Sequence, residues 1–143
     1  MPQIVLEHSA NLECDCHIAE LLLGIHKLVS EIAGVRLENC KSRRYRCDDF
    51  CVGEGLAGNA FAHLDVRFIE GRSKAVKASL GEALLTHLET AYATAIANAS
   101  APSPDHSTTQ DAANSEAIQI TVEVRDIRID DYHKFPQGTL TAQ

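Results

Sequence analysis

The stretch FAHLDVRFIEGRSKAV, residues 61–76, contains the two patterns that determine the fold. Residues 61–69 alternate between apolar and polar side chains, as expected for a strand with one buried face. A short turn, residues 70–73, follows, and Ser73 is a good N-cap for a helix. The apolar positions of that helix recur at helical spacing: Val76, Leu80, Leu84, Leu88, Ala91 and Ala95.

The N-terminal half repeats the order strand, helix, strand. Residues 4–8 alternate and predict a mostly buried first strand. A helix of about 17 residues is predicted from the apolar spacing between Ile18 and Ile32, with Gly34 as its stop. Residues 40–47, CKSRRYRC, are interpreted as a second strand because they lie between this helix and a Gly-rich loop.

Residues 98–117 are rich in Ala, Ser, Thr, Pro and Asp and predict a flexible loop inserted in the domain. A last amphipathic strand follows, with Ile118, Ile120, Val122 and Val124 on one side. In the C-terminal tail, residues 126–143, Ile127 and Ile129 change phase, which indicates a bulge or bend.

These elements predict one α+β domain spanning residues 1–143. Two β-α-β units would form a four-stranded mixed sheet with two helices on one face. Apolar residues occur at both parities of the first strand, Ile4 and Leu6 against Val5. The second sheet face is therefore also expected to be buried, and an oligomer would bury it.

The composition excludes several classes of partner. A formal net charge of -7 argues against nucleic-acid binding, which needs a positive field. No apolar run is long enough to span a bilayer, and no charged leader precedes an apolar segment. We therefore expect a cytoplasmic protein that binds neither nucleic acid nor membrane.

The five cysteines are expected to be reduced thiols rather than metal ligands. Cys14, Cys16 and His17 form C-x-C-H, whereas Cys47 and Cys51 form C-x-x-x-C. Neither spacing is the paired C-x-x-C of zinc ribbons. No metal and no cofactor are predicted.

Pro2 has two possible meanings. Because proline has no backbone N–H, it is suited to the position just before a strand. Alternatively, removal of Met1 would expose a secondary amine that serves as a base, provided that burial or nearby cations lower its pKa. If Met1 is retained, the Pro2 nitrogen is an amide and cannot be a base.

Cations are concentrated in a short part of this acidic chain. Residues 36–46 contain five of the 13 Lys and Arg residues, which suggests an anion site. Lys41, Arg43 and Tyr45 share one parity of the presumed strand and would project together. Arg72 precedes a helix N-terminus, where an anion is also favoured. Taken singly, the basic strand residues favour a solvated strand edge, and Arg72 favours a residue that merely decorates a turn.

Four short motifs, in this order and spacing, resemble the tautomerase superfamily, and most closely the 5-carboxymethyl-2-hydroxymuconate isomerases. The resemblance covers residues 2–97 and, more weakly, the last strand. The motifs are Pro2-Gln3-Ile4-Val5-Leu6-Glu7, Ser42-Arg43, Ala60-Phe61-Ala62-His63 and Gly71-Arg72-Ser73.

The resemblance implies a homotrimer and an isomerase of aromatic-compound catabolism that moves an allylic proton on a 2-hydroxymuconate-type di- or tricarboxylate. Pro2 would be the acid/base, and Arg72 would stabilise the dienolate. Lys41, Arg43 and Tyr45 would bind substrate, although Lys41 replaces an arginine of the family pattern and lacks its bidentate fork. The alternative is a noncatalytic domain of the same fold that binds an anion or small ligand.

Overall fold

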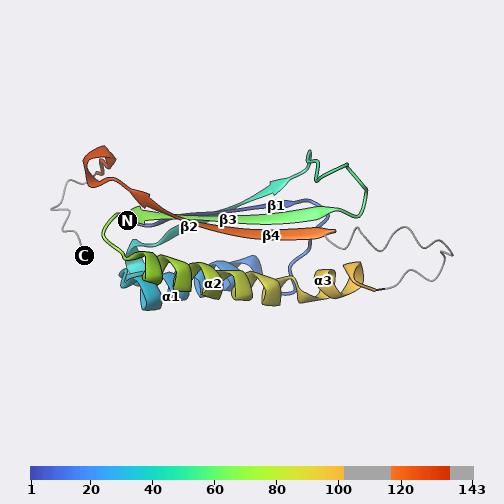
Figure 1. Cartoon of the computed structure of the whole chain (residues 1–143), viewed down its shortest axis with the longest axis horizontal. Coiled ribbons are helices and arrows are strands. Elements are labelled where there is room, and N and C mark those ends of the chain that lie inside the picture. Colours follow the sequence, from blue (N-terminus) through green and yellow to red (C-terminus); the bar gives the residue numbers. More distant parts are fainter. Residues whose placement is uncertain (102–116, 136–143) are drawn as a thin grey trace.

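The computed structural model describes residues 1–101 and 117–135, in which a four-stranded sheet carries helices on one face (Figure 1). The strand order is β2-β1-β3-β4. β1 is parallel to β2 and antiparallel to β3, and β3 is parallel to β4. This confirms the predicted mixed sheet. The strands are β1 (Gln3–Ser9), β2 (Lys41–Cys47), β3 (Ala60–Ile69) and β4 (Ile118–Ile127).

The helices lie on the same face of the sheet, as predicted (Figure 1). α1 ends at Ala33 and is followed by the C-cap Gly34, whose φ of 64° is left-handed and therefore suits glycine. The Ser73 hydroxyl caps α2 by accepting a hydrogen bond from the Val76 amide at 3.2 Å. The helices are α1 (Ile18–Ala33), α2 (Lys74–Ala91) and α3 (Ala93–Ala99), with short 3-10 turns η1 (Leu37–Asn39) and η3 (Ile129–Asp131).

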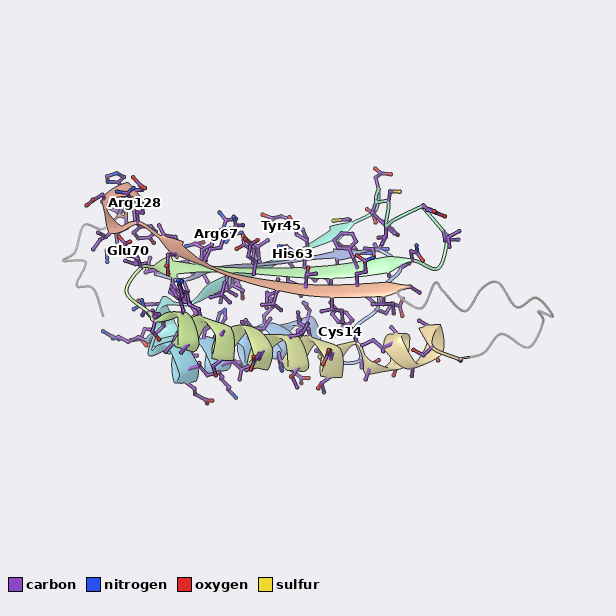
Figure 2. The ribbon with its side chains drawn as sticks, in the orientation of Figure 1. Cys14, Tyr45, His63, Arg67, Glu70 and Arg128 are labelled. Carbon is purple, nitrogen blue, oxygen red and sulfur yellow. The ribbon has the colours of Figure 1, made fainter. Side chains whose placement is uncertain are left out.

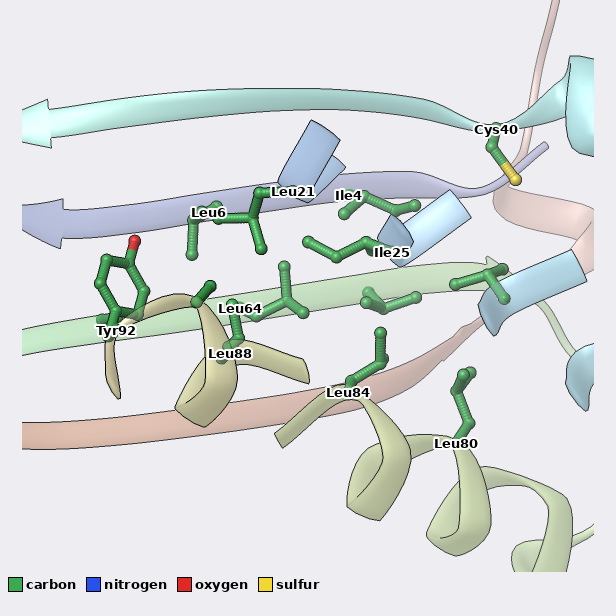
Figure 3. Close-up of a cluster of buried hydrophobic side chains, with 14 of the residues drawn as sticks. Ile4, Leu6, Leu21, Ile25, Cys40, Leu64, Leu80, Leu84, Leu88 and Tyr92 are labelled. Carbon is green, nitrogen blue, oxygen red and sulfur yellow. The ribbon is translucent and has the colours of Figure 1, made fainter. Parts of the chain in front are cut away.

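The core lies between the helices and the sheet (Figure 3). Ile4 and Leu6 of β1 and Leu64 of β3 are fully buried, because alternate strand residues all project to the helix side. The matching helix positions are buried leucines and an isoleucine at the predicted spacing: Leu21, Ile25, Leu80, Leu84 and Leu88.

Three sequence predictions need correction. Of the bulge or bend predicted at Ile127 and Ile129, the bulge is wrong, because β4 pairs regularly with β3 up to Ile69↔Ile127, and the chain instead turns into η3. The helical stripe does not run without interruption to Ala95, since α2 ends at Ala91 and α3 begins at Ala93. Of the predicted loop 98–117, the first residues belong to α3 and its end, whereas residues 102–116 lie outside the described part.

The other sheet face carries polar and charged side chains (Figure 2). At its centre, Asp65 is 5% exposed and accepts hydrogen bonds from Arg67 Nε at 2.7 Å and Arg125 Nη2 at 2.9 Å. Burial alone would raise the pKa of the Asp65 carboxyl, but the two guanidinium groups outweigh it and lower that pKa. This face therefore combines paired charges with the half-buried Val5. No helix in the described ranges is both long and apolar enough to cross a bilayer.

We expect Asp65→Asn to lower the free energy of unfolding at neutral pH by about 1.5–3 kcal/mol, because charge-assisted hydrogen bonds are lost. Since the folded pKa of Asp65 lies below its ordinary value of 3.8, the wild-type advantage is present above that value and disappears as pH falls through the folded pKa. Urea denaturation across acidic pH measures both effects. Asp48→Asn is the control, because Asp48 is exposed. If the difference in the free energy of unfolding between wild type and Asp65→Asn did not change with pH, the explanation by charge-assisted hydrogen bonds would be contradicted.

Candidate active site

Pro2 lies at the start of the sheet, directly before β1. Its side chain is buried, and its carbonyl oxygen accepts a hydrogen bond from the Lys41 amide at 3.3 Å. The pairing Gln3↔Lys41 begins the β1–β2 ladder, so the N-terminus of the chain lies beside the first residue of β2. Proline suits this position because no ladder hydrogen bond is required of its nitrogen.

Arg72 is held by the backbone of two neighbouring elements. Its Nε donates to the Ala33 carbonyl at 3.0 Å, and its Nη1 donates to the Ile69 carbonyl at 2.9 Å. The guanidinium carbon lies 5.0 Å from the centre of the Phe68 ring, a cation–π distance. Gly71 precedes Arg72 in this turn and has a φ of 125°, a backbone angle that residues with a side chain rarely adopt. A guanidinium has five N–H donors, so Arg72 keeps further donors for an anion.

Cations surround the N-terminal amine, which in the described chain belongs to Met1. Burial is the largest cause that lowers the pKa of this amine, followed by the charges of Lys41, Lys134 and Arg72. Lys41 also places its Nζ 3.3 Å from the Met1 sulfur. The pKa of the neighbouring Cys40 thiol is raised, mainly by burial. The registers Gln3↔Lys41 and Gln3↔Arg67 thus place Pro2, Lys41 and the turn with Arg72 at the same end of the sheet.

Sequence reasoning missed Lys134 and Cys40. Lys134 lies beyond η3, and Figure 1 shows this segment at the same end of the sheet as the N-terminus. No local pattern marks Lys134, because only the length and direction of β4 bring it back to Met1. Cys40 could have been suggested by its place next to Lys41.

Arg43 and Tyr45 are farther along β2. Arg43 Nη1 donates to Gln3 Oε1 at 2.9 Å, so it remains close to the start of β1. Tyr45 pairs with Glu7 and is 52% exposed on the sheet face opposite the helices (Figure 2). At about 3.3 Å per strand residue, Tyr45 lies about 13 Å along β2 from Lys41. Within one chain, Tyr45 is therefore not part of the cluster at Pro2.

The intervening residue of the Lys41-Ser42-Arg43 pattern faces the helices. Ser42 Oγ lies 2.8 Å from His26 Nε2 on α1, within hydrogen-bond distance. The alternation predicted for this strand is therefore present. Among the described residues, no group of three or more His, Cys, Asp or Glu side chains is arranged to hold a metal ion.

The mixed four-stranded sheet with helices on one face is the fold of solved 5-carboxymethyl-2-hydroxymuconate isomerase and 4-OT structures. A sequence model of the 5-carboxymethyl-2-hydroxymuconate isomerase family matches residues 2–101. The chain is a member of that family. The match supports isomerase activity of the tautomerase type.

Solved structures show the same fold at low sequence identity. A 5-carboxymethyl-2-hydroxymuconate isomerase from Deinococcus radiodurans R1 aligns with TM-score 0.72 and 22% identity, covering 93% of this chain and 87% of that chain. A 5-carboxymethyl-2-hydroxymuconate delta-isomerase gives TM-score 0.63, 16% identity and coverage of 96% and 89%. A fused 4-OT described as a symmetric trimer gives TM-score 0.62, 19% identity and coverage of 94% and 92%. Comparison with curated protein sequences gives no significant match.

We expect Lys41→Gln to raise the pKa of the N-terminal amine, because one of the cations that disfavour the ammonium form is removed. Lys134→Gln should act in the same direction with a smaller effect. NMR titration of the isotopically labelled terminal residue measures the pKa. Lys27→Gln, an exposed α1 variant with the same charge change, should leave it unchanged. Equal amine pKa values in wild type and Lys41→Gln would contradict the cation cluster.

Proposed function

We propose that this protein moves an allylic proton on a 2-hydroxymuconate-type di- or tricarboxylate, such as 5-carboxymethyl-2-hydroxymuconate, in aromatic-compound catabolism. The observation that carries the proposal is the position of Pro2 at the end of the sheet that also holds Lys41 and the Arg72 turn, where burial and positive charges lower the pKa of the N-terminal amine. Membership of the 5-carboxymethyl-2-hydroxymuconate isomerase family supports the same substrate class. An anionic substrate also agrees with a cationic cluster in a chain whose net charge is -7.

Removal of Met1 is the first requirement of this mechanism. The Pro2 nitrogen then becomes a secondary amine in the buried position just before β1. Burial and the positive charges of Lys41, Lys134 and Arg72 act against protonation, as they do for the Met1 amine. Pro2 is therefore neutral at a lower pH than a free amine would be, which a general base requires.

The proton transfer then proceeds in two steps without net oxidation or reduction. The neutral Pro2 nitrogen takes the proton of the 2-hydroxyl group, and the electron pair of that O–H bond delocalises into a dienolate. Arg72 stabilises the developing negative charge through its remaining N–H donors. The Pro2 ammonium returns the proton to a carbon of the conjugated system, which leaves a 2-oxo product with the double bond shifted. Lys41 and Arg43 hold substrate carboxylates.

The proposed assembly is a homotrimer. The fused 4-OT structure is described as a symmetric trimer. On this chain, the sheet face without helices carries Val5 and the paired charges around Asp65. An assembly that covers this face also offers a role to Tyr45, because a residue far from Pro2 in its own chain can meet the Pro2 of a neighbouring copy.

The decisive experiment on the base is intact mass measurement of the native protein followed by kinetics of Pro2→Ala. We expect a mass without Met1. We expect Pro2→Ala to lower kcat on 5-carboxymethyl-2-hydroxymuconate by about 10²-fold with little change in KM, because a primary amine replaces the secondary one. If Met1 is retained, the Pro2 nitrogen is an amide and cannot act as a base, and the alternative, a noncatalytic domain that binds an anion or small ligand, is then favoured. An unchanged kcat would remove Pro2 from the mechanism.

We expect Arg72→Ala to lower kcat/KM by about 10²–10³-fold, since a donor to the developing charge is lost. Because Arg72 also bonds the Ala33 and Ile69 carbonyls, thermal unfolding must be measured alongside activity. Arg72→Lys should retain part of the activity by keeping the charge. Arg36→Ala is the control, because Arg36 is exposed and paired with Glu38. If Arg72→Ala folds and has wild-type kcat/KM, the proposed role of Arg72 is wrong.

A further inference from the structure

A cationic pocket lies at the other end of β1 from Pro2. Its cavity volume is about 370 Å³. His8 from β1, Arg44 and Arg46 from β2, and Ile18 at the start of α1 line it. Arg44 and Arg46 have the opposite parity to Lys41 and Arg43, so they project toward the helix side of the sheet. None of these side chains has a role in the proposed isomerase site.

His8 presents an unpartnered nitrogen in this region. The side chain is only 4% exposed, and Nδ1 lies 2.9 Å from the Ser9 carbonyl oxygen. A carbonyl can only accept, so Nδ1 carries the hydrogen and the neutral ring leaves a lone pair on Nε2. Nε2 is buried and has no hydrogen-bond partner among the described residues. Burial is the main cause that lowers the pKa of His8, and Arg44 and Arg46 lower it further.

The remaining groups leave the pocket positively charged. Arg44 makes no ion pair or side-chain hydrogen bond within the described ranges, whereas Arg46 lies 3.5 Å from Asp48. The N-terminal end of α1 contributes a positive partial charge, and its N-cap residue, His17, provides no side-chain cap. Glu13 is the acidic lining residue, and it is exposed.

The Cys16 thiol and the Tyr92 phenol in the lining are uncharged at neutral pH. The Sγ atoms of Cys14 and Cys16 lie 3.2 Å apart on the helix side of the sheet, and Figure 2 labels Cys14 there. Burial is the main cause that raises the pKa of Cys16 to about 11 and that of Tyr92 to about 12. Cys16 and Tyr92 therefore do not offset the charges of Arg44 and Arg46 at neutral pH.

We propose that this pocket binds inorganic phosphate, or a phosphate group that keeps an acidic hydroxyl, through Arg44, Arg46 and the Nε2 atom of His8. The two guanidinium groups require acceptor oxygens, whereas Nε2 requires a donor. Monohydrogen phosphate supplies both, because its P–O⁻ oxygens accept and its P–OH group donates. Sulfate has the same shape and charge but no hydrogen, and an ionised carboxylate also lacks one. The site is thus built to distinguish phosphate from sulfate.

The test compares phosphate with sulfate on the wild-type protein at mildly alkaline pH, where both anions carry two charges. Titration calorimetry measures affinity, and the His8 ring nitrogen signals in NMR report on this pocket alone. We expect phosphate to bind at least about tenfold more tightly than sulfate and to shift the Nε2 signal. No substitution in the core is needed for this comparison. Equal affinities, or phosphate binding that leaves the His8 signals unchanged, would overturn the proposal.

Arg44→Gln provides an independent check, because Arg44 is exposed and its replacement should not prevent folding. We expect it to lower the affinity for both anions at the His8-reported site by about tenfold or more. Arg36→Gln, which removes the same charge beyond the far end of α1, should leave both affinities unchanged. Wild-type affinity in Arg44→Gln would overturn the assignment. Neither result depends on turnover, so failure here leaves the proposed isomerase function untouched.

Discussion

The structure depends on the pairing of β1 with strands on both sides. β1 is parallel to β2 and antiparallel to β3, so the residues from Gln3 to His8 are paired with a neighbouring strand on both sides. This double pairing holds the first residues of the chain, which are otherwise prone to fraying. It also sets the register Gln3↔Lys41, which places Pro2 beside the first cation of β2. Without that register, the amine and Lys41 would not share one site.

The alternation of β2 divides its cations between two locations. Lys41 and Arg43 project away from the helices, close to the N-terminus, whereas Arg44 and Arg46 line a pocket near His8. A strand that appears as one basic run in the sequence therefore supplies two separate electrostatic environments. Because the chain as a whole has a net charge of -7, the positive charge at each of these two locations is local and does not extend over the surface.

The parts of the fold that could be predicted were those with strong local signals. The apolar spacing of α1, the left-handed stop at Gly34 and the cap at Ser73 involve neighbours within a few residues, and all three are confirmed. The end of β4 was harder, because the apolar positions Ile127 and Ile129 belong to a strand end and a 3-10 turn. Periodicity cannot distinguish such an ending from a bulge, since both change the phase of the apolar residues.

The candidate site also contains some residues that the sequence predicted and others that only the tertiary structure added. Pro2, the basic strand and the turn with Arg72 were predicted from the order and spacing of four short motifs, because each motif on its own is also compatible with a structural role. Tertiary contacts were needed to add Lys134 and Cys40, to anchor Arg72 on the Ala33 carbonyl, and to separate Tyr45 from Pro2. The physical reason is distance along the chain: side-chain parity is a local property, whereas the charges that act on one amine come from segments up to 133 positions apart and meet only when the strands pair.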